Sequence, residues 1–245
     1  MRRITRQPLD QGVQADLIVR QTSVDQKRNN AGFSATDEWK AARHTHTLNS
    51  VVITLRHMTG ERQRCVYCLD SHGTDIEHFW PKTPYPERMF LWLNMLLCCS
   101  ECGRFKGDRF PLANGMPLLV DPTAEDPWQH LDFDPTTGNV VPRFDVSQND
   151  YAIKGMETVK LLQLDQREAM ASGYKKTLSR VSRIVAEAMG QIDLSAAGLI
   201  AQLNDADDHG LLAWCFNYSG RNEVPFCRLR ERYPDVWAAC ADAFA

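Results

Sequence analysis

Four cysteines, arranged as two Cys-x-x-Cys pairs, set the strongest limit on how this chain folds. The pairs are Cys65–Cys68 and Cys99–Cys102, and thirty residues separate them. Each pair can place two thiolates on one tetrahedral ion, and two pairs complete a closed four-sulfur shell of the structural zinc type. Chance spacing or a redox-active pair is the alternative, but two pairs at this separation favour zinc.

The rest of the cysteine usage agrees with a metal site. Five of the eight cysteines lie between Cys65 and Cys102, and the basic residues at the N-terminus are not followed by an apolar segment. Clustered cysteines in a chain without a secretion signal indicate metal binding rather than disulfides. We therefore expect a cytoplasmic protein without a membrane segment. The remaining cysteines are expected to be buried apolar residues: Cys98, Cys215, Cys227 and Cys240.

Composition narrows the class of protein further. Charged residues make up 24% of the 245 residues, hydrophobic residues make up 43%, and the formal net charge is −3. This composition is globular and excludes wholesale disorder. The near-neutral total says little about partners, but the charge changes sign along the chain, from +4 over residues 1–60 to −6 over residues 111–150. This distribution argues against binding of nucleic acid over the whole surface, although local basic faces remain open.

The pattern along the chain predicts four parts: residues 1–60, 61–120, 121–148 and 149–245. The first thirty residues are polar and are expected to be irregular, and a helix is expected over 34–60. A short strand is predicted over 74–79, an apolar return segment over 94–99 and a helix over 101–108. The acidic segment 121–148 is expected to be a connector with a hairpin turn at 134–139.

The C-terminal part is expected to be helical throughout. Asp165 begins a capping-box-like sequence, and Tyr174, Val181 and Val185 recur at helical spacing along one face. Lys176, Arg180 and Arg183 lie on the opposite face, which is most simply a solvated surface. Further helices are predicted over 195–203, 210–218 and the C-terminal stretch, with a break at Pro234.

Between the cysteine pairs lies a second pattern. Glu77 and His78 stand before Pro81 and Lys82, Asn94 precedes the second pair, and Lys106-Gly107-Asp108 follows it. Over residues 65–108 this order resembles the HNH (ββα-metal) endonuclease family, many members of which carry a four-cysteine zinc site. The Glu-His-x-x-Pro-Lys sequence and Leu119-Val120-Asp121-Pro122 also look like the PtuB-like group of HNH proteins. That group acts in bacterial anti-phage defence of the Septu and retron kind, usually beside a partner ATPase.

The resemblance implies a fold and a set of roles. The fold would be α+β and mainly helical, with a zinc-stabilised ββα-metal unit embedded between an N-terminal helix and a C-terminal helical bundle. His78 would be the general base, Glu77 a ligand of a catalytic Mg²⁺ or Mn²⁺ ion, and Asn94 would orient His78 by hydrogen bonds. A neutral imidazole can accept a proton from water near neutral pH, and hard cations prefer oxygen ligands. The candidates for phosphate contact are Lys82, Arg104 and Lys106.

Two points in this assignment need a special explanation. Adjacent residues on a regular strand point to opposite faces, so Glu77 and His78 could flank one phosphate only if the strand end is irregular. Many relatives also carry an Asn or His ligand after the last cysteine, where this chain has Gly103. The replacement ligands considered are Asp75, His72, Asp108 and Asp121.

The sequence therefore predicts a metal-dependent endonuclease that hydrolyses phosphodiester bonds, with DNA favoured as substrate and RNA kept open. One alternative is a non-catalytic zinc-stabilised module that binds nucleic acid or a partner protein, which Gly103 favours. Another is an effector that is inert alone and cleaves only in complex with a partner ATPase.

Overall fold

The computed structural model describes all of residues 1–245 and shows an α+β, mainly helical protein. The N-terminal helices are α1 (Gln11–Lys27), α2 (Ala35–Ala42) and α3 (His46–Met58). The C-terminal helices are α5 (Ile153–Leu162), α6 (Glu168–Ala188), α7 (Ala196–Ala206), α8 (Leu212–Asn217), α9 (Phe226–Arg232) and α10 (Pro234–Ala243). The predicted fold class is confirmed.

All strands pair in antiparallel two-stranded sheets. The central pair is β1 (Asp75–His78) with β2 (Met95–Cys98), and α4 (Ser100–Lys106) follows it directly. The smaller pairs are β3 (Leu112–Ala113) with β4 (Met116–Pro117), β5 (Leu131–Phe133) with β6 (Val140–Pro142), and β7 (Phe144–Asp145) with β8 (Asp150–Tyr151). We call β1, β2 and α4 the ββα unit. Its strand, return strand and helix lie where the sequence predicts them, and the β5–β6 hairpin confirms the predicted turn at 134–139.

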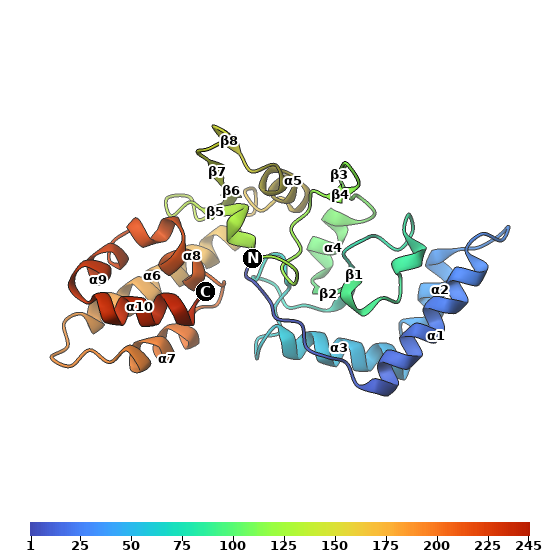
Figure 1. The fold of residues 1–245 in the computed structure, drawn as a ribbon, viewed down its shortest axis with the longest axis horizontal. Helices are drawn as coiled ribbons and strands as arrows, with labels where there is room; N and C mark the ends of the chain where they lie inside the picture. Colours follow the sequence, from blue (N-terminus) through green and yellow to red (C-terminus); the bar gives the residue numbers. More distant parts are fainter.

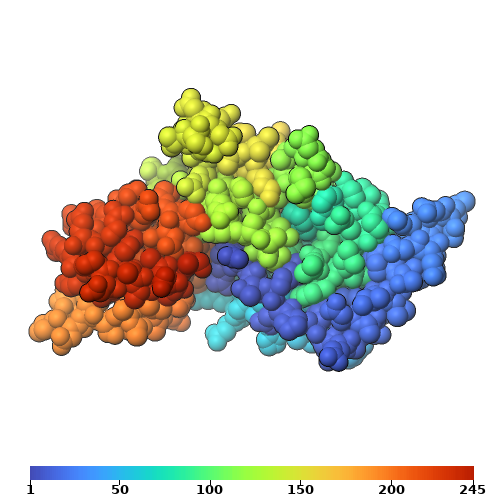
Figure 2. Space-filling model, in the orientation of Figure 1, coloured from blue at the N-terminus to red at the C-terminus, as the bar shows by residue number.

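The ββα unit occupies the middle of the molecule. In Figure 1, α6 to α10 lie at one end of the long axis, α1 and α2 lie at the other, and β1, β2 and α4 lie between them. In the space-filling view of Figure 2, the N-terminal residues (blue) lie directly against the residues of the ββα unit (cyan to green). Nearly all of the buried apolar side chains form one cluster, which runs from Met1 to Phe244 and includes Leu17 of α1.

The expectation of an irregular N-terminal segment is wrong, because residues 11–27 form α1. Asp10 caps this helix by accepting hydrogen bonds from the backbone N–H groups of Gly12 and Val13. Only Leu17, Gln21 and Val24 are buried, so the apolar stripe is narrow and includes a polar residue. The weak periodicity in the sequence reflects that composition.

Gln21 explains why α1 carries a polar residue on its buried side. Its amide group donates to the carbonyl oxygen of Pro86 at 3.1 Å and accepts from the backbone N–H of Phe90 at 2.8 Å. Helix α1 therefore holds the loop that joins β1 to β2.

Two further helix predictions need correction. The helix expected over 34–60 is divided into α2 and α3, because Arg43 to Thr45 leave the helical path. Helix α6 begins at Glu168 rather than at the Asp165 capping sequence, and its N-cap residue Arg167 makes no side-chain capping bond. The guanidinium of Arg167 instead donates a hydrogen bond to the sulfur of Cys102 in the cysteine cluster.

Candidate active site and zinc centre

The four paired cysteines converge on one point. The sulfur atoms of Cys65, Cys68, Cys99 and Cys102 all lie within 4.8 Å of one another, and all four residues are buried. A tetrahedral zinc ion with Zn–S bonds of about 2.3 Å requires sulfur–sulfur distances of about 3.8 Å. The Cys68–Cys99 distance of 3.9 Å meets this requirement, and no cysteine forms a disulfide. The donor set therefore fits the predicted zinc ion.

Local backbone geometry brings the two pairs together. The N–H of Cys65 bonds to the carbonyl of Ser71, and Leu69 adopts a left-handed conformation with φ of 52°, so the first pair lies on a tight turn. The second pair begins α4, where the sulfur of Cys99 accepts from the N–H of Cys102 at 3.4 Å. Cys98 is buried but lies outside the four-sulfur group, as predicted.

Arg167 is a contact of this centre that the sequence did not reveal. Its Nη1 donates to the sulfur of Cys102 at 3.3 Å, and its Nη2 forms an ion pair with Glu101. The side chain is only 9% exposed. Because Arg167 lies 65 residues from Cys102, no local spacing in the sequence indicates this contact.

The β1–β2 ladder is regular, which corrects the expectation of an irregular strand end. Glu77 pairs with Leu96 and His78 pairs with Met95, without a bulge. The two side chains accordingly contact different elements: Glu77 faces Lys106 of α4, whereas the His78 ring contacts Trp39 of α2 and the loop at Met89.

Glu77 forms a largely buried ion pair. Its Oε1 accepts from Nζ of Lys106 at 2.8 Å, and the same ammonium donates to the backbone carbonyl of His78 at 2.7 Å. Burial raises the pKa of Glu77, and the Lys106 charge opposes that rise. Lys106 is fully buried, so in this structure its ammonium is not exposed for the predicted phosphate contact.

The surroundings of Glu77 decide which metal ligands the unit offers. A Cβ atom placed on Gly103 would lie 3.6 Å from the Oε2 of Glu77, so position 103 faces this carboxylate but supplies no ligand. The four cysteines form the only group of three or more potential metal-ligating side chains in the chain. None of the proposed replacements, His72, Asp75, Asp108 or Asp121, joins Glu77 in such a group.

Glu77 is therefore the predicted ligand that remains for a catalytic divalent ion, outside any group of three or more ligating side chains. Its Oε2 makes no hydrogen bond. Mg²⁺ in proteins often keeps several waters and is held by one or two carboxylates together with substrate phosphates. The residues present fit an ion of that kind, and they do not form a site with several protein ligands.

His78 is held in one protonation state. Its Nε2 lies 2.9 Å from the carbonyl oxygen of Met89, so Nε2 carries the proton and Nδ1 carries the lone pair. Burial, with a smaller contribution from the Lys82 charge, lowers the pKa of His78 to about 3. Nδ1 makes no hydrogen bond, and this atom is not completely buried, so it retains some contact with solvent. The ring is therefore a neutral acceptor, although the residue as a whole is only 4% exposed.

Asn94 acts on the loop rather than on the His78 ring, which corrects its predicted hydrogen bonding. Its Oδ1 accepts from the N–H of Trp80 at 2.7 Å. Its Nδ2 donates to the carbonyls of Trp80 at 3.0 Å and Arg88 at 2.9 Å. These bonds join the start of the loop to its end, next to the Met89 carbonyl that holds His78.

The other two predicted phosphate contacts remain free of salt bridges. Lys82 is partly buried, and its charge lowers the pKa of both Glu77 and His78. Arg104 is exposed on α4, with its guanidinium 5.8 Å from the centre of the Phe105 ring.

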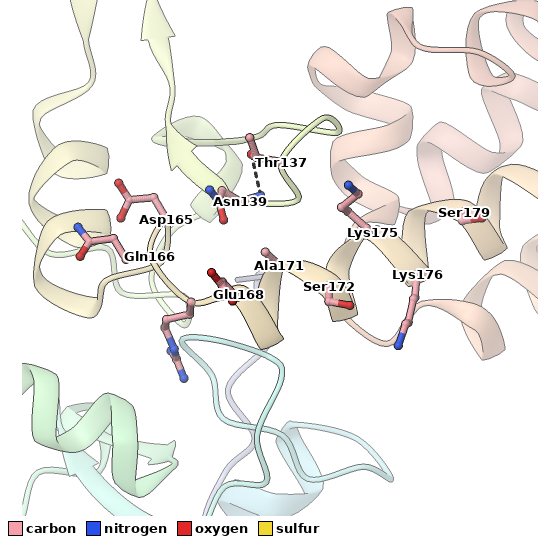
Figure 3. A pocket seen from close by; sticks show the side chains of 11 residues that line it. Thr137, Asn139, Asp165, Gln166, Glu168, Ala171, Ser172, Lys175, Lys176 and Ser179 are labelled. Atoms are coloured by element: carbon pink, nitrogen blue, oxygen red, sulfur yellow. Dashed lines mark hydrogen bonds between the residues drawn. The ribbon is translucent and has the colours of Figure 1, made fainter.

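A large cavity of the protein lies elsewhere. It measures about 760 Å³ and lies between the β5–β6 turn and the N-terminal half of α6, where Figure 3 shows Thr137 and Asn139 opposite Glu168 and Lys175. Its lining is almost entirely polar, and Lys175 is already bonded to the carbonyl of Thr136. A second cavity of about 500 Å³ is lined by Phe79, Trp80 and Asn94, so it adjoins the loop after His78. We consider the second cavity the more relevant one for the chemistry, because it borders the candidate site.

These features define an α+β, mainly helical protein with a four-cysteine cluster that can hold a metal ion, next to a glutamate–histidine pair. A comparison with models of known protein families found no match. Over 158 residues the chain is 26% identical to the Septu protein PtuB of Bacillus thuringiensis. The matching region covers 60% of this chain and 56% of that protein, so the chain spans little more than half the length of this relative. No helix has both the length and the apolar character needed to cross a membrane.

Proposed function

We propose that the protein is a metal-dependent endonuclease of the HNH type that hydrolyses phosphodiester bonds. DNA is the favoured substrate and RNA the alternative, and the setting is bacterial anti-phage defence with a partner ATPase. The similarity to a Septu protein supports the setting. The single observation that carries the chemistry is the bond from His78 Nε2 to the carbonyl of Met89, which leaves Nδ1 unprotonated.

The proposed mechanism assigns a role to each group of the site. Nδ1 of His78 accepts a proton from the attacking water, and the Met89 carbonyl keeps the ring in the required tautomer. Asn94 holds the loop so that this carbonyl stays in place. A divalent ion at Glu77, when bound, neutralises charge that develops on the phosphate. Lys82, whose charge lowers the pKa of both Glu77 and His78, contributes an ammonium that holds the phosphate in position.

Burial of His78 supports gating by a partner. A general base must be reached by water and by the scissile phosphate, but this imidazole is 4% exposed and lies against Trp39. We therefore infer that the chain in this conformation is inactive, and that contact with the partner moves α2 away from His78.

A second candidate function is a non-catalytic, zinc-stabilised module that binds nucleic acid or a partner protein. Two observations favour it: Gly103 supplies no ligand, and Lys106 already neutralises Glu77. In this alternative the ββα unit is a binding surface only.

Cleavage assays separate the two candidates. Purified protein is incubated with DNA or RNA, with Mg²⁺, Mn²⁺ or a chelator too weak to remove zinc, and with or without the neighbouring gene product. The endonuclease proposal expects divalent-dependent cleavage that His78→Ala abolishes at unchanged zinc content. His57→Ala, which alters an exposed histidine of α3, is the matched control. Binding without cleavage under every condition would support the second candidate.

A further inference from the structure

The buried ammonium of Lys106 lies where it must influence any ion at Glu77. It bonds to Glu77 Oε1 at 2.8 Å and to the His78 carbonyl at 2.7 Å, and none of the side chain is exposed. We propose that Lys106 is a positioning residue that keeps Glu77 neutralised in the free protein, so that a divalent ion binds only together with a nucleic-acid phosphate. This inference rests on the proposed function and concerns how the same site is regulated.

The Lys106 charge weakens the attraction between Glu77 and a divalent cation. A buried carboxylate already paired with an ammonium carries little net negative charge, and charge interactions are strong in a poorly solvated interior. A divalent cation at Oε2 would approach the ammonium that holds Oε1 of the same carboxylate. The ion would therefore meet repulsion from Lys106 and only part of the attraction that a free carboxylate offers.

Glu77 also lacks neighbouring side chains that could complete a site for a divalent ion. Gly103 faces Oε2 but has no side chain, and no group of three or more acidic or histidine ligands includes Glu77. One neutralised carboxylate does not retain an ion against water. A phosphate group would add negative charge and oxygen ligands together, which are the two things the free site lacks.

Packing contacts keep the Lys106 ammonium in place. Its second bond is to a backbone carbonyl of β1, and its ammonium lies 5.8 Å from the centre of the Phe110 ring. Moving the ammonium away would leave Glu77 and the His78 carbonyl without this partner in the interior. The ion must therefore bind beside Lys106 and does not replace it.

Mn²⁺ binding measured by electron paramagnetic resonance tests the inference without any cleavage. Wild-type protein alone should bind Mn²⁺ weakly, and a cleavage-resistant phosphorothioate DNA should raise the Mn²⁺ affinity by about tenfold or more. Glu77→Gln with the same DNA is the control, and it should show no gain. Free wild-type protein that binds Mn²⁺ as tightly as the DNA complex would overturn the inference.

A second variant tests the role of the ammonium directly. Lys106→Met keeps the length of the side chain and removes its charge, so the free variant should gain about tenfold in Mn²⁺ affinity, and Glu77→Gln in the same variant should cancel the gain. A folded Lys106→Met protein with normal zinc content and no gain would contradict the proposal. If the variant does not fold, the wild-type measurement with and without DNA decides.

The two proposals fail in different ways. DNA-coupled Mn²⁺ binding without cleavage would leave the inference standing and remove the endonuclease proposal. Cleavage by a protein that holds Mn²⁺ equally well without DNA would do the reverse.

Discussion

The indole of Trp39 meets the imidazole of His78 edge to face, with ring centroids 4.4 Å apart and planes inclined at 80°. Trp39 lies on α2, an eight-residue helix whose only buried residues are Ala35 and Ala42. A short helix with so little buried surface is held weakly by the rest of the protein. The contact therefore covers the candidate base with an element that can move at modest cost.

Removing this cover should expose His78. We expect Trp39→Ala to increase the rate at which diethyl pyrocarbonate modifies His78 several-fold, measured by peptide mass spectrometry. The pKa of His78 should also rise from about 3 towards the ordinary value of about 6.5, because burial is the main cause of its depression. Trp39→Phe keeps an aromatic ring over the imidazole and should change both quantities less. Equal modification of wild type and Trp39→Ala would show that α2 does not protect His78.

The tautomer of His78 can be observed directly. Two-dimensional ¹H–¹⁵N spectra of the ring should show a protonated Nε2 and an unprotonated Nδ1 at neutral pH, because Met89 accepts from Nε2. Since the folded pKa lies below the unfolded value, the neutral ring favours the folded state. The stability that His78 contributes should be complete above about pH 6.5 and decline as the pH falls towards about 3. A ring that becomes charged near pH 6.5 in the folded protein would contradict this prediction.

Loss of the Asn94 amide should loosen the loop after His78. Asn94→Ala leaves the N–H of Trp80 and two carbonyls without their partner. We expect a loss of about 1–3 kcal/mol in the free energy of unfolding, measured by urea denaturation with the zinc content monitored. Asn94→Asp keeps the acceptor for Trp80 but neither donor, so it should retain only part of the loop's stability. Unchanged stability in the alanine variant would rule out the proposed role.

The cysteine cluster should bind one zinc ion per chain and require it for folding. Cys65→Ser or Cys99→Ser should unfold the ββα unit, because structural zinc binding is coupled to folding. Cys227→Ser is the control, since Cys227 is half-buried and lies outside the cluster. Zinc content by mass spectrometry and thermal unfolding provide the measurements. A metal-free protein with an unchanged melting temperature would refute the zinc assignment.

Arg167 should slow the release of zinc. Its N–H bond to Cys102 stabilises the thiolate, and groups of this kind around metal ligands affect metal affinity by about 10–100-fold. We expect Arg167→Gln to release zinc faster to a colorimetric chelator. Arg183→Gln, an exposed position on the same helix, is the matched control and should behave like wild type. Equal release from all three proteins would leave Arg167 with a packing role only.

Prediction from sequence succeeded where neighbours in the chain define the structure. Both Cys-x-x-Cys pairs, the strand ending at His78 and the helix after Cys99 are local patterns, and each is present. It failed for α1, whose buried stripe includes Gln21, because that polar side chain serves a loop 65 residues away. It also failed for Lys106. A charged residue beside the motif is expected at the surface, but the tertiary structure buries this ammonium, where it pairs with Glu77.

Spacing along the chain determined the metal-binding chemistry, because two cysteines three residues apart can reach one ion wherever that segment lies. It also determined the order strand, strand, helix around the glutamate–histidine pair. Only the tertiary structure decided which groups surround that pair: Trp39 over the imidazole, Lys106 on the carboxylate and Arg167 on the Cys102 sulfur. The physical reason is that such contacts join residues 29 to 65 positions apart, and they depend on how whole helices pack against the ββα unit.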